Sequence, residues 1–260
     1  MSYAAFGYLR RQYLCVLRRN ATLVATLMLG GGVPVLAQSA GVVPDGRTQT
    51  VLTNHGNVTD ISTQTVHGNN AFNSFSSFNV AAGQTVNLLL PGQASNLLNL
   101  VHGAQSNING LVNSYKNGSI GGNVFFFNPY GVVVGSTGVI NVGSLTIATP
   151  TAAYMDKLIS PLGVVDDAAT AAALAGKIPL SASGLVLVKG RIHASDAITL
   201  AADRVDVASG ASLVAGPMAQ VAFADLVNMG SFASATQVQV NAGVVRILAA
   251  KDIRIAGQIS

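Results

Sequence analysis

The fold is decided by VFFFNPYGVVVGSTGVINVGSL, residues Val124–Leu145. This stretch contains three short apolar runs, separated and followed by three turn signals, within about twenty residues. Its first run, Val124–Phe127, is apolar throughout and rich in aromatic and β-branched residues, which predicts a strand buried on both faces. No helix fits turn signals at this spacing, so the stretch predicts short strands that stack as a parallel sheet.

The first turn signal is Asn128-Pro129-Tyr130-Gly131. Proline has no N–H for a strand ladder and fixes its own φ, while Asn and Gly supply the dihedral angles of a tight turn. Tyrosine adopts left-handed backbone poorly, so Gly131 is expected to carry the positive φ of this turn. The second and third turn signals are residues 135–138 (GSTG) and 141–143 (NVG).

The composition combines high hydrophobicity with low charge. Half of the residues are apolar, 9% are charged and Glu is absent, whereas soluble domains carry about a quarter charged residues. A membrane protein would need apolar runs of about 20 residues, and none occurs after Leu29. A β-solenoid explains both features, because it buries small aliphatic side chains inside each coil and presents Ser, Thr and Asn outside.

The N-terminus predicts a signal peptide over residues 1–37. Four Arg precede a short apolar run at 21–29, a Gly/Pro break follows, and Val35-Leu36-Ala37 precedes Gln38. The apolar run is too short for a permanent membrane span, and cleavage is expected between Ala37 and Gln38.

Cleavage there would change the electrostatics. The chain has 14 Lys and Arg against 10 Asp, and four of the Arg lie in the signal segment, which leaves ten against ten. A neutral, scattered charge distribution argues against a nucleic-acid partner. The single cysteine, Cys15, also lies before the cleavage site, so the mature chain would form no disulfide.

The rest of the chain divides into three parts. Residues 38–150 are predicted to hold an N-terminal β cap, over 38–70, and then the first coils. Residues 151–183 have helical spacing at 154–159 and 167–174, with the pair Asp166-Asp167 as the expected N-cap, and predict an excursion with short helices. Residues 184–260 are predicted to return to coils. The predicted fold is therefore an all-β, right-handed parallel β-helix with a cap and a partly helical excursion.

The last part contains a weak repeat. LAADRVDVA, starting at Leu200, and LAAKDIRIA, starting at Leu248, share one pattern with an offset of 48. This offset predicts two coils of about 24 residues each. A β-sandwich is the alternative, because its strands also alternate, but hairpin dipeptides are sparse here.

Several motifs in order resemble the secretion domain at the N-terminus of two-partner secretion exoproteins, the filamentous haemagglutinin and high-molecular-weight adhesin group. Residues 128–131 resemble its Asn-Pro-Asn-Gly signature, with Tyr130 where the second Asn is usual. Phe78-Asn79 resembles the start of its F-N-I opening, and Asn99 with Ile108-Asn109-Gly110 resembles its N-R-V and I-x-G pair. Leu100 stands where Arg is usual, and Phe75 where Trp is common. About seventy residues agree in order and spacing.

This resemblance implies a non-catalytic secretion domain of an adhesin-like exoprotein, secreted or held at the cell surface. After export by the Sec machinery, its unfolded N-terminus would be recognised by the periplasmic binding repeats of a dedicated outer-membrane transporter. Its folding outside would nucleate the rest of the β-helix, and a host-surface receptor or glycan is a further expected partner. Asn128, Pro129, Tyr130 and Gly131 would form the recognition motif, with Phe78, Asn79, Asn99, Ile108 and Gly110 as the secondary motif.

The rival hypothesis is a secreted β-helix enzyme that cleaves polysaccharide, because Asp203, Arg204 and Asp206 lie on a predicted solenoid strand. Such an enzyme needs convergent carboxylates in a cleft. The four His, at 55, 67, 102 and 193, lack metal-ligand spacing, so neither a metal nor a cofactor is expected. We therefore predict no enzymatic turnover of acidic sugars.

Overall fold

The computed structural model describes residues 41–216, 237–240 and 244–259. The predicted signal segment and its cleavage between Ala37 and Gln38 lie outside these residues. Within the described part of the chain, no helix is both long and apolar enough to cross a membrane.

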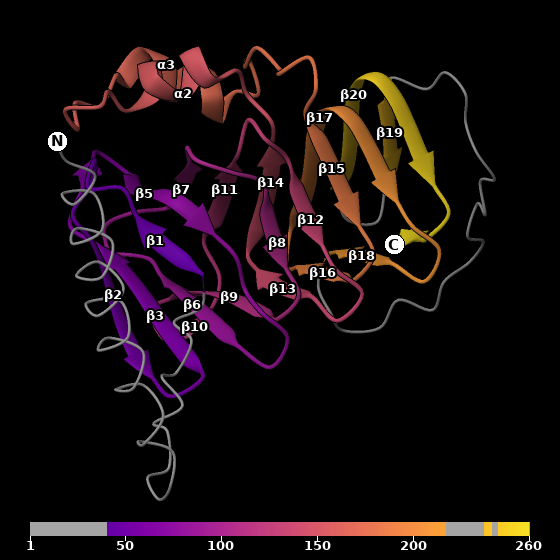
Figure 1. The fold of residues 1–260 in the computed structure, drawn as a ribbon, viewed down its shortest axis with the longest axis horizontal. Coiled ribbons are helices and arrows are strands. Elements are labelled where there is room, and N and C mark those ends of the chain that lie inside the picture. Colours follow the sequence, from indigo (N-terminus) through magenta and orange to yellow (C-terminus); the bar gives the residue numbers. More distant parts are fainter. Residues whose placement is uncertain (1–40, 217–236, 241–243, 260) are drawn as a thin grey trace, which may run out of the picture. The chain divides into compact units, whose positions relative to one another are not determined.

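Short strands that stack in parallel from one coil to the next dominate the structure (Figure 1). The described residues form six coils. The first contains β5 (Asn70–Phe78) and β6 (Thr85–Leu89); the second β7 (Asn96–Val101), β8 (Ser106–Ile108) and β9 (Leu111–Lys116); the third β11 (Asn123–Phe127), β12 (Val132–Val134) and β13 (Val139–Val142); the fourth β14 (Ser144–Ala148), β15 (Leu185–Val188) and β16 (Arg191–Ala194); the fifth β17 (Ala197–Val207) and β18 (Ser212–Ala215); the sixth β20 (Val244–Ile255) and β21 (Gln258–Ile259).

Parallel pairing confirms the predicted β-helix and contradicts the sandwich alternative. β7, β11, β14 and β17 pair in parallel along one wall of the coils, β8, β12, β15 and β17 along a second, and β6, β9, β13, β16 and β18 along a third. The long strands β17 and β20 turn the corner between the first two walls, where their register shifts between Ala202 and Arg204. Alternate residues point inward and form one continuous apolar core, which includes Phe78, Ile108 and Ile140.

The deciding stretch largely follows its sequence pattern. β11 is buried on both faces, as predicted, because Phe126 is 4% and Phe127 0% exposed on opposite sides of the strand. The third turn is shorter than the predicted residues 141–143. Asn141 and Val142 extend β13, and only Gly143 separates β13 from β14. This position needs glycine, because a Cβ there would lie 2.6 Å from the carbonyl oxygen of Gly122.

Antiparallel strands close the first edge of the coils. β1 (Val42–Pro44) and β4 (Val66–His67) pair with β5, while β2 (Thr50–His55) pairs with β3 (Val58–Thr63), which stacks in parallel on β6. Two further antiparallel strands lie elsewhere: β10 (Ser119–Ile120) pairs with β9, and β19 (Gln237–Val240) pairs with β20.

Two helices leave the fourth coil between β14 and β15: α2 (Ala152–Leu158) and α3 (Asp167–Leu174). Asp166 caps α3 as predicted, since its Oδ1 accepts a hydrogen bond of 2.8 Å from the Ala169 N–H. Both helices lie over the outer face of the first wall (Figure 1). They bury a second apolar cluster, which we call the helix-covered cluster and which includes Phe72, Leu98, Leu100, Phe127, Met155 and Leu158.

The 48-residue repeat has a different meaning from the one predicted. β17 and β20 are direct neighbours, so the repeat separates one coil from the next rather than two. Its length includes residues 217–236 and 241–243, which the structure does not describe. The offset is 48 only after the register shift, as for Arg204 beside Asp252, and 47 before it, as for Leu200 beside Ile247.

A ladder of side-chain amides runs along the outside of the third wall. Asn87 Nδ2 donates to Asp60 Oδ1 (2.8 Å), Asn113 to Asn87 (3.1 Å) and Asn141 to Asn113 (2.9 Å). The far end is His193, whose Nδ1 lies 3.2 Å from Asn141 Oδ1 and donates to it. Burial, with the nearby charge of Arg191, keeps the pKa of His193 below its usual value of 6.5. Hydrogen bonds that point one way polarise each other, so the ladder holds successive coils in register.

Candidate functional site

The Asn128–Gly131 turn connects the third coil to both of its neighbours. Asn128 is fully buried, and its Nδ2 donates to Ala104 O (2.8 Å) and Ser106 Oγ (3.0 Å) in the coil before it. Its Oδ1 accepts a hydrogen bond of 2.9 Å from the Tyr130 N–H, within the turn. Its own N–H donates to Ala148 O (3.0 Å) in the coil after it. One amide side chain therefore both shapes the turn and fastens it to the adjacent coil.

Gly131 carries the positive φ of this turn, at 104°, as the sequence predicted. A second constraint also demands glycine, because a Cβ there would lie 2.7 Å from the Leu185 carbonyl oxygen in the next coil. Pro129 is buried, whereas Tyr130 is 50% exposed. Tyrosine is tolerated in place of the usual Asn because its backbone avoids the left-handed region and its ring reaches the surface.

The secondary motif residues are distributed along the coil interior and corners. Phe78 is fully buried, with its ring edge-on to Phe126 at 4.9 Å. Asn79 Oδ1 accepts the Asn107 N–H (2.9 Å), and Ile108 is 1% exposed. Any Cβ on Gly110 would collide with backbone carbonyl oxygens of the preceding coil. These residues do not converge on one site; each sits where two coils touch.

Asn99 lies inside the coil. It shares the inward side of β7 with Leu97 and Val101, where Asn73 Nδ2 donates to its Oδ1 (3.1 Å). Its own Nδ2 lies 3.4 Å from Phe125 O. A buried amide is tolerated because these bonds satisfy it.

The two other departures from the family pattern are both accommodated by burial. Leu100, where Arg is usual, packs in the helix-covered cluster. Phe75, where Trp is common, lies in the coil core, 5.2 Å from Phe78 between ring centroids.

Sequence reasoning missed a polar network at the cap, which we call the cap network: Asp45, Arg47, Ser74, His102 and Asp156. Asp45 Oδ2 accepts from Ser74 Oγ (2.7 Å) and lies 3.0 Å from His102 Nδ1 and 3.3 Å from Arg47 Nε. Arg47 Nη1 reaches Asp156 Oδ1 of α2 (2.6 Å) and Ile159 O (3.2 Å). The network therefore joins the cap, two coils and the helical excursion.

Ser, His and Asp in contact suggest a nucleophilic triad, but the geometry differs. Asp45 Oδ2 and Ser74 Oγ both meet the same ring nitrogen, His102 Nδ1, at 3.0 and 3.2 Å. A triad needs the hydroxyl at the opposite nitrogen, Nε2. His102 Nε2 is buried and has no hydrogen-bond partner among the described residues. The cluster lacks the geometry of a triad, and its contacts join the cap to the first two coils.

The pKa of Asp45 makes the cap network measurable. Burial raises this pKa, but hydrogen bonds from His102, Ser74 and the Arg47 N–H, with the His102 charge, outweigh burial and bring it below the usual 3.8. A pKa lowered by folding stabilises the folded state above pH 3.8, and that contribution is lost as pH falls through the folded-state value.

We expect Asp45→Asn to lower the free energy of unfolding by about 2 kcal/mol at pH 7, the scale of hydrogen bonds to a charged group. The difference from wild type should shrink as pH falls below 3.8. Urea unfolding followed by circular dichroism between pH 3 and 7 measures it. A difference that is the same at both ends of this range would contradict the assignment.

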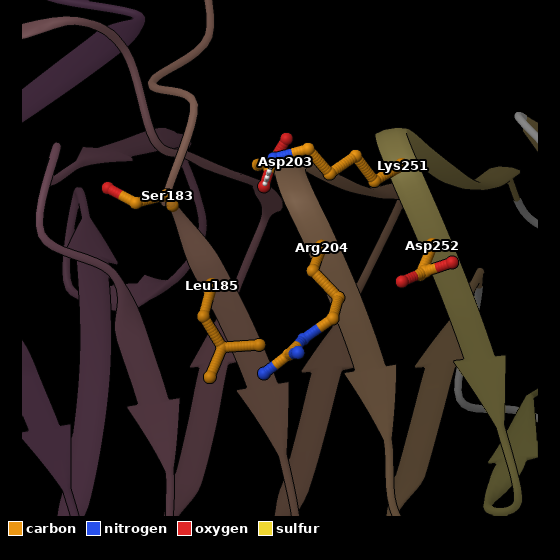
Figure 2. A pocket seen from close by; sticks show the side chains of 7 residues that line it. Ser183, Leu185, Asp203, Arg204, Lys251 and Asp252 are labelled. Atoms are coloured by element: carbon orange, nitrogen blue, oxygen red, sulfur yellow. Dashed lines mark hydrogen bonds and ion pairs between the residues drawn. The ribbon is translucent and has the colours of Figure 1, made fainter.

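Two residues of the enzyme hypothesis lie at the corner of β17 and β20 and line a polar notch of about 260 Å³. Its lining is Ser183, Gly184, Leu185, Asp203, Arg204, Lys251 and Asp252. In Figure 2, Lys251 reaches across to Asp203, and Arg204 projects toward the strand of Leu185. Lys251 Nζ lies 2.9 Å from Asp203 Oδ2 and 3.0 Å from Ala182 O.

Asp203 is 8% exposed and occupies the register shift, so its pairing with Lys251 clamps the corner. Asp206 is not part of the notch lining, and it lies in register with Arg254 instead. Glycosidic cleavage uses two carboxylates that flank the scissile bond. The notch therefore does not bring together the two carboxylates on which the enzyme hypothesis rests.

Taken together, the cap, the parallel coils and the glycine-dependent Asn-Pro turn define a β-helical domain. The TPS secretion domain family model matches residues 40–260, so the chain belongs to this family, the secretion domain of two-partner secretion exoproteins. The family is non-catalytic, and its members are exported through the Gram-negative envelope with an outer-membrane transporter. A search of curated proteins gives no match.

Proposed function

We propose that this chain is the secretion domain of an adhesin-like exoprotein and that its cognate transporter reads the Asn128–Gly131 turn before the chain folds. The supporting observation is the burial of the motif. Asn128 and Pro129 are buried in the folded coils. The Asn128 side chain forms hydrogen bonds with Ala104 O, Ser106 Oγ and the Tyr130 N–H. A transporter reaches these groups only in the unfolded chain.

The same residues then have a second task outside the cell. Once the chain emerges, Asn128 and Gly131 join three successive coils, so the sequence that the transporter releases is also a point at which coils stack. Recognition in the periplasm and folding outside thus use one segment at different times. The adhesin role rests on the family resemblance and on the polar amide ladder, which offers an extended outer surface.

Photo-crosslinking tests the recognition step. A p-benzoylphenylalanine in place of Tyr130 keeps an aromatic ring at a half-exposed position, so it should not disturb the fold. In cells that make the precursor and the transporter of the same operon, irradiation should yield a covalent adduct between the two. Immunoblots against both proteins detect it.

The matched control is the same residue in place of Leu162, which is 92% exposed and lies outside the motif, between α2 and α3. Little or no adduct is expected there. Equal adducts at both positions, or none at position 130, would remove the proposal that this turn is the recognised segment.

A further inference from the structure

A groove of about 380 Å³ lies where the end of α3 meets the outer face of β11, β14, β17 and β20. Its floor is a row of outward side chains that are neighbours in register: Phe125 beside Thr146, Thr146 beside Thr199, and Thr199 beside Arg246. Adjacent strands are about 4.8 Å apart, so the row runs about 14 Å from Phe125 to Arg246. The groove includes no residue of the Asn128–Gly131 turn, and the proposed secretion function does not explain it.

The apolar end of the groove is a fixed aromatic platform. Phe125 is half-buried, and its ring packs edge-on to Phe127, with centroids 6.0 Å apart and planes at 68°. Phe127 is itself locked in the helix-covered cluster. Leu174 also lines the groove, and Leu248 lines it on β20, the strand that carries Arg246. A flat ring held in this way suits the C–H face of a sugar.

The other side chains that carry the argument are polar and of two kinds. Thr146 and Thr199 are half-buried and place two adjacent hydroxyls in the middle of the row. The last turn of α3, which ends at Leu174, borders the groove, but its carbonyl groups at 171–173 already accept hydrogen bonds from the N–H groups of residues 175–177. Arg246 is exposed and is the only ionisable side chain among the described residues that line the groove.

From this arrangement we infer that the groove binds an acidic disaccharide unit of a glycan. One ring stacks on Phe125, and the carboxylate of the second ring forms a charge-assisted pair with Arg246. Sugar hydroxyls exchange hydrogen bonds with the side chains of Thr146 and Thr199. A single ring is too short to contact both ends of the row. A fatty acid would fill the apolar end but offer no hydrogen-bond partner to the hydroxyls of Thr146 and Thr199.

The test uses the purified, folded secreted chain and needs no transporter, so its result is independent of the proposed secretion function. The probe is a disaccharide that contains glucuronic acid, and the comparison ligand is the same disaccharide with the carboxyl group reduced to an alcohol. Titration calorimetry should give a Kd of about 1 mM or tighter for the acid. The reduced sugar should bind at least about tenfold more weakly, the scale of losing one charge-assisted bond.

Arg246→Gln should bring the affinity for the acid down to that for the reduced sugar. Its matched control is Arg254→Gln, which removes the same charge from an exposed position on the same strand outside the groove and should change neither affinity. Phe125→Leu should weaken the binding of both sugars. If Phe125→Leu alters the melting curve, the nearly isosteric Thr199→Val takes its place and should also weaken the binding of both sugars. No binding of the acid at about 10 mM, equal binding of both sugars, or an unchanged Arg246→Gln variant would each overturn the inference.

Discussion

Gly131→Ala is expected to lower the free energy of unfolding by about 3 kcal/mol or more and to leave the precursor in the periplasm. Two costs combine at this position. The backbone has φ of 104°, which L-residues other than Gly strongly disfavour, and the new Cβ would lie 2.7 Å from the Leu185 carbonyl oxygen of the next coil. Urea unfolding of the purified chain measures stability, and immunoblots of periplasm and culture supernatant measure export.

Gly138→Ala separates recognition from folding. A Cβ on Gly138 would also collide with a neighbouring coil, at the Ile108 carbonyl oxygen, but Gly138 is outside the Asn128–Gly131 turn and has no positive φ. We expect this variant to lose stability and still be exported. Equal retention of both variants would mean that export depends on coil stability and not on the turn, while full export of Gly131→Ala would contradict the recognition proposal outright.

Arg47→Met is expected to destabilise the chain by about 3 kcal/mol, because it removes one partner from a largely buried ion pair and leaves Asp45 less compensated. For a chain of this size the melting temperature should fall by about 6–12 °C. Hydrogen exchange should accelerate first in β1 and β2, since the guanidinium joins the cap to α2.

Asp156→Asn provides the comparison. Asp156 accepts the same guanidinium at 2.6 Å but its side chain is 50% exposed, so its loss should cost less than about 1 kcal/mol. If both variants lose the same stability, the contact with α2 and not the buried Asp45 pair holds the cap. If Arg47→Met melts like wild type, the cap network does not stabilise the fold.

The sequence predicted features that depend on a few neighbouring residues. Alternating aliphatic residues gave the strands of the coils, the Asn-Pro pair and Gly131 gave a turn with its positive φ on the glycine, and Asp166 before an Ala-rich run gave a capped helix. Each of these follows from local sterics, hydrogen bonding or period-two burial, so no knowledge of distant residues was needed.

Pairing across coils was harder to predict, because it depends on residues that are distant in the sequence. The repeat at Leu200 and Leu248 was assigned to two coils, because sequence spacing cannot distinguish a coil from a coil plus an excursion. Asn141 was assigned to a turn, although its amide forms part of a ladder with Asn113 below it and His193 above it. Local propensity for Asn favours turns, and the stacked neighbours overrode it.

By itself, the sequence determined the class of fold and the local shape of the motif that marks the secretion domain, because both arise from side-chain period and backbone dihedrals. Only the tertiary structure decided which side of a coil Asn99 faces, that Arg47 meets Asp156 across 109 positions, and that the α3 end adjoins the row from Phe125 to Arg246. Such contacts depend on how many residues each coil and excursion contains, and this number sets which distant side chains come to lie in the same layer.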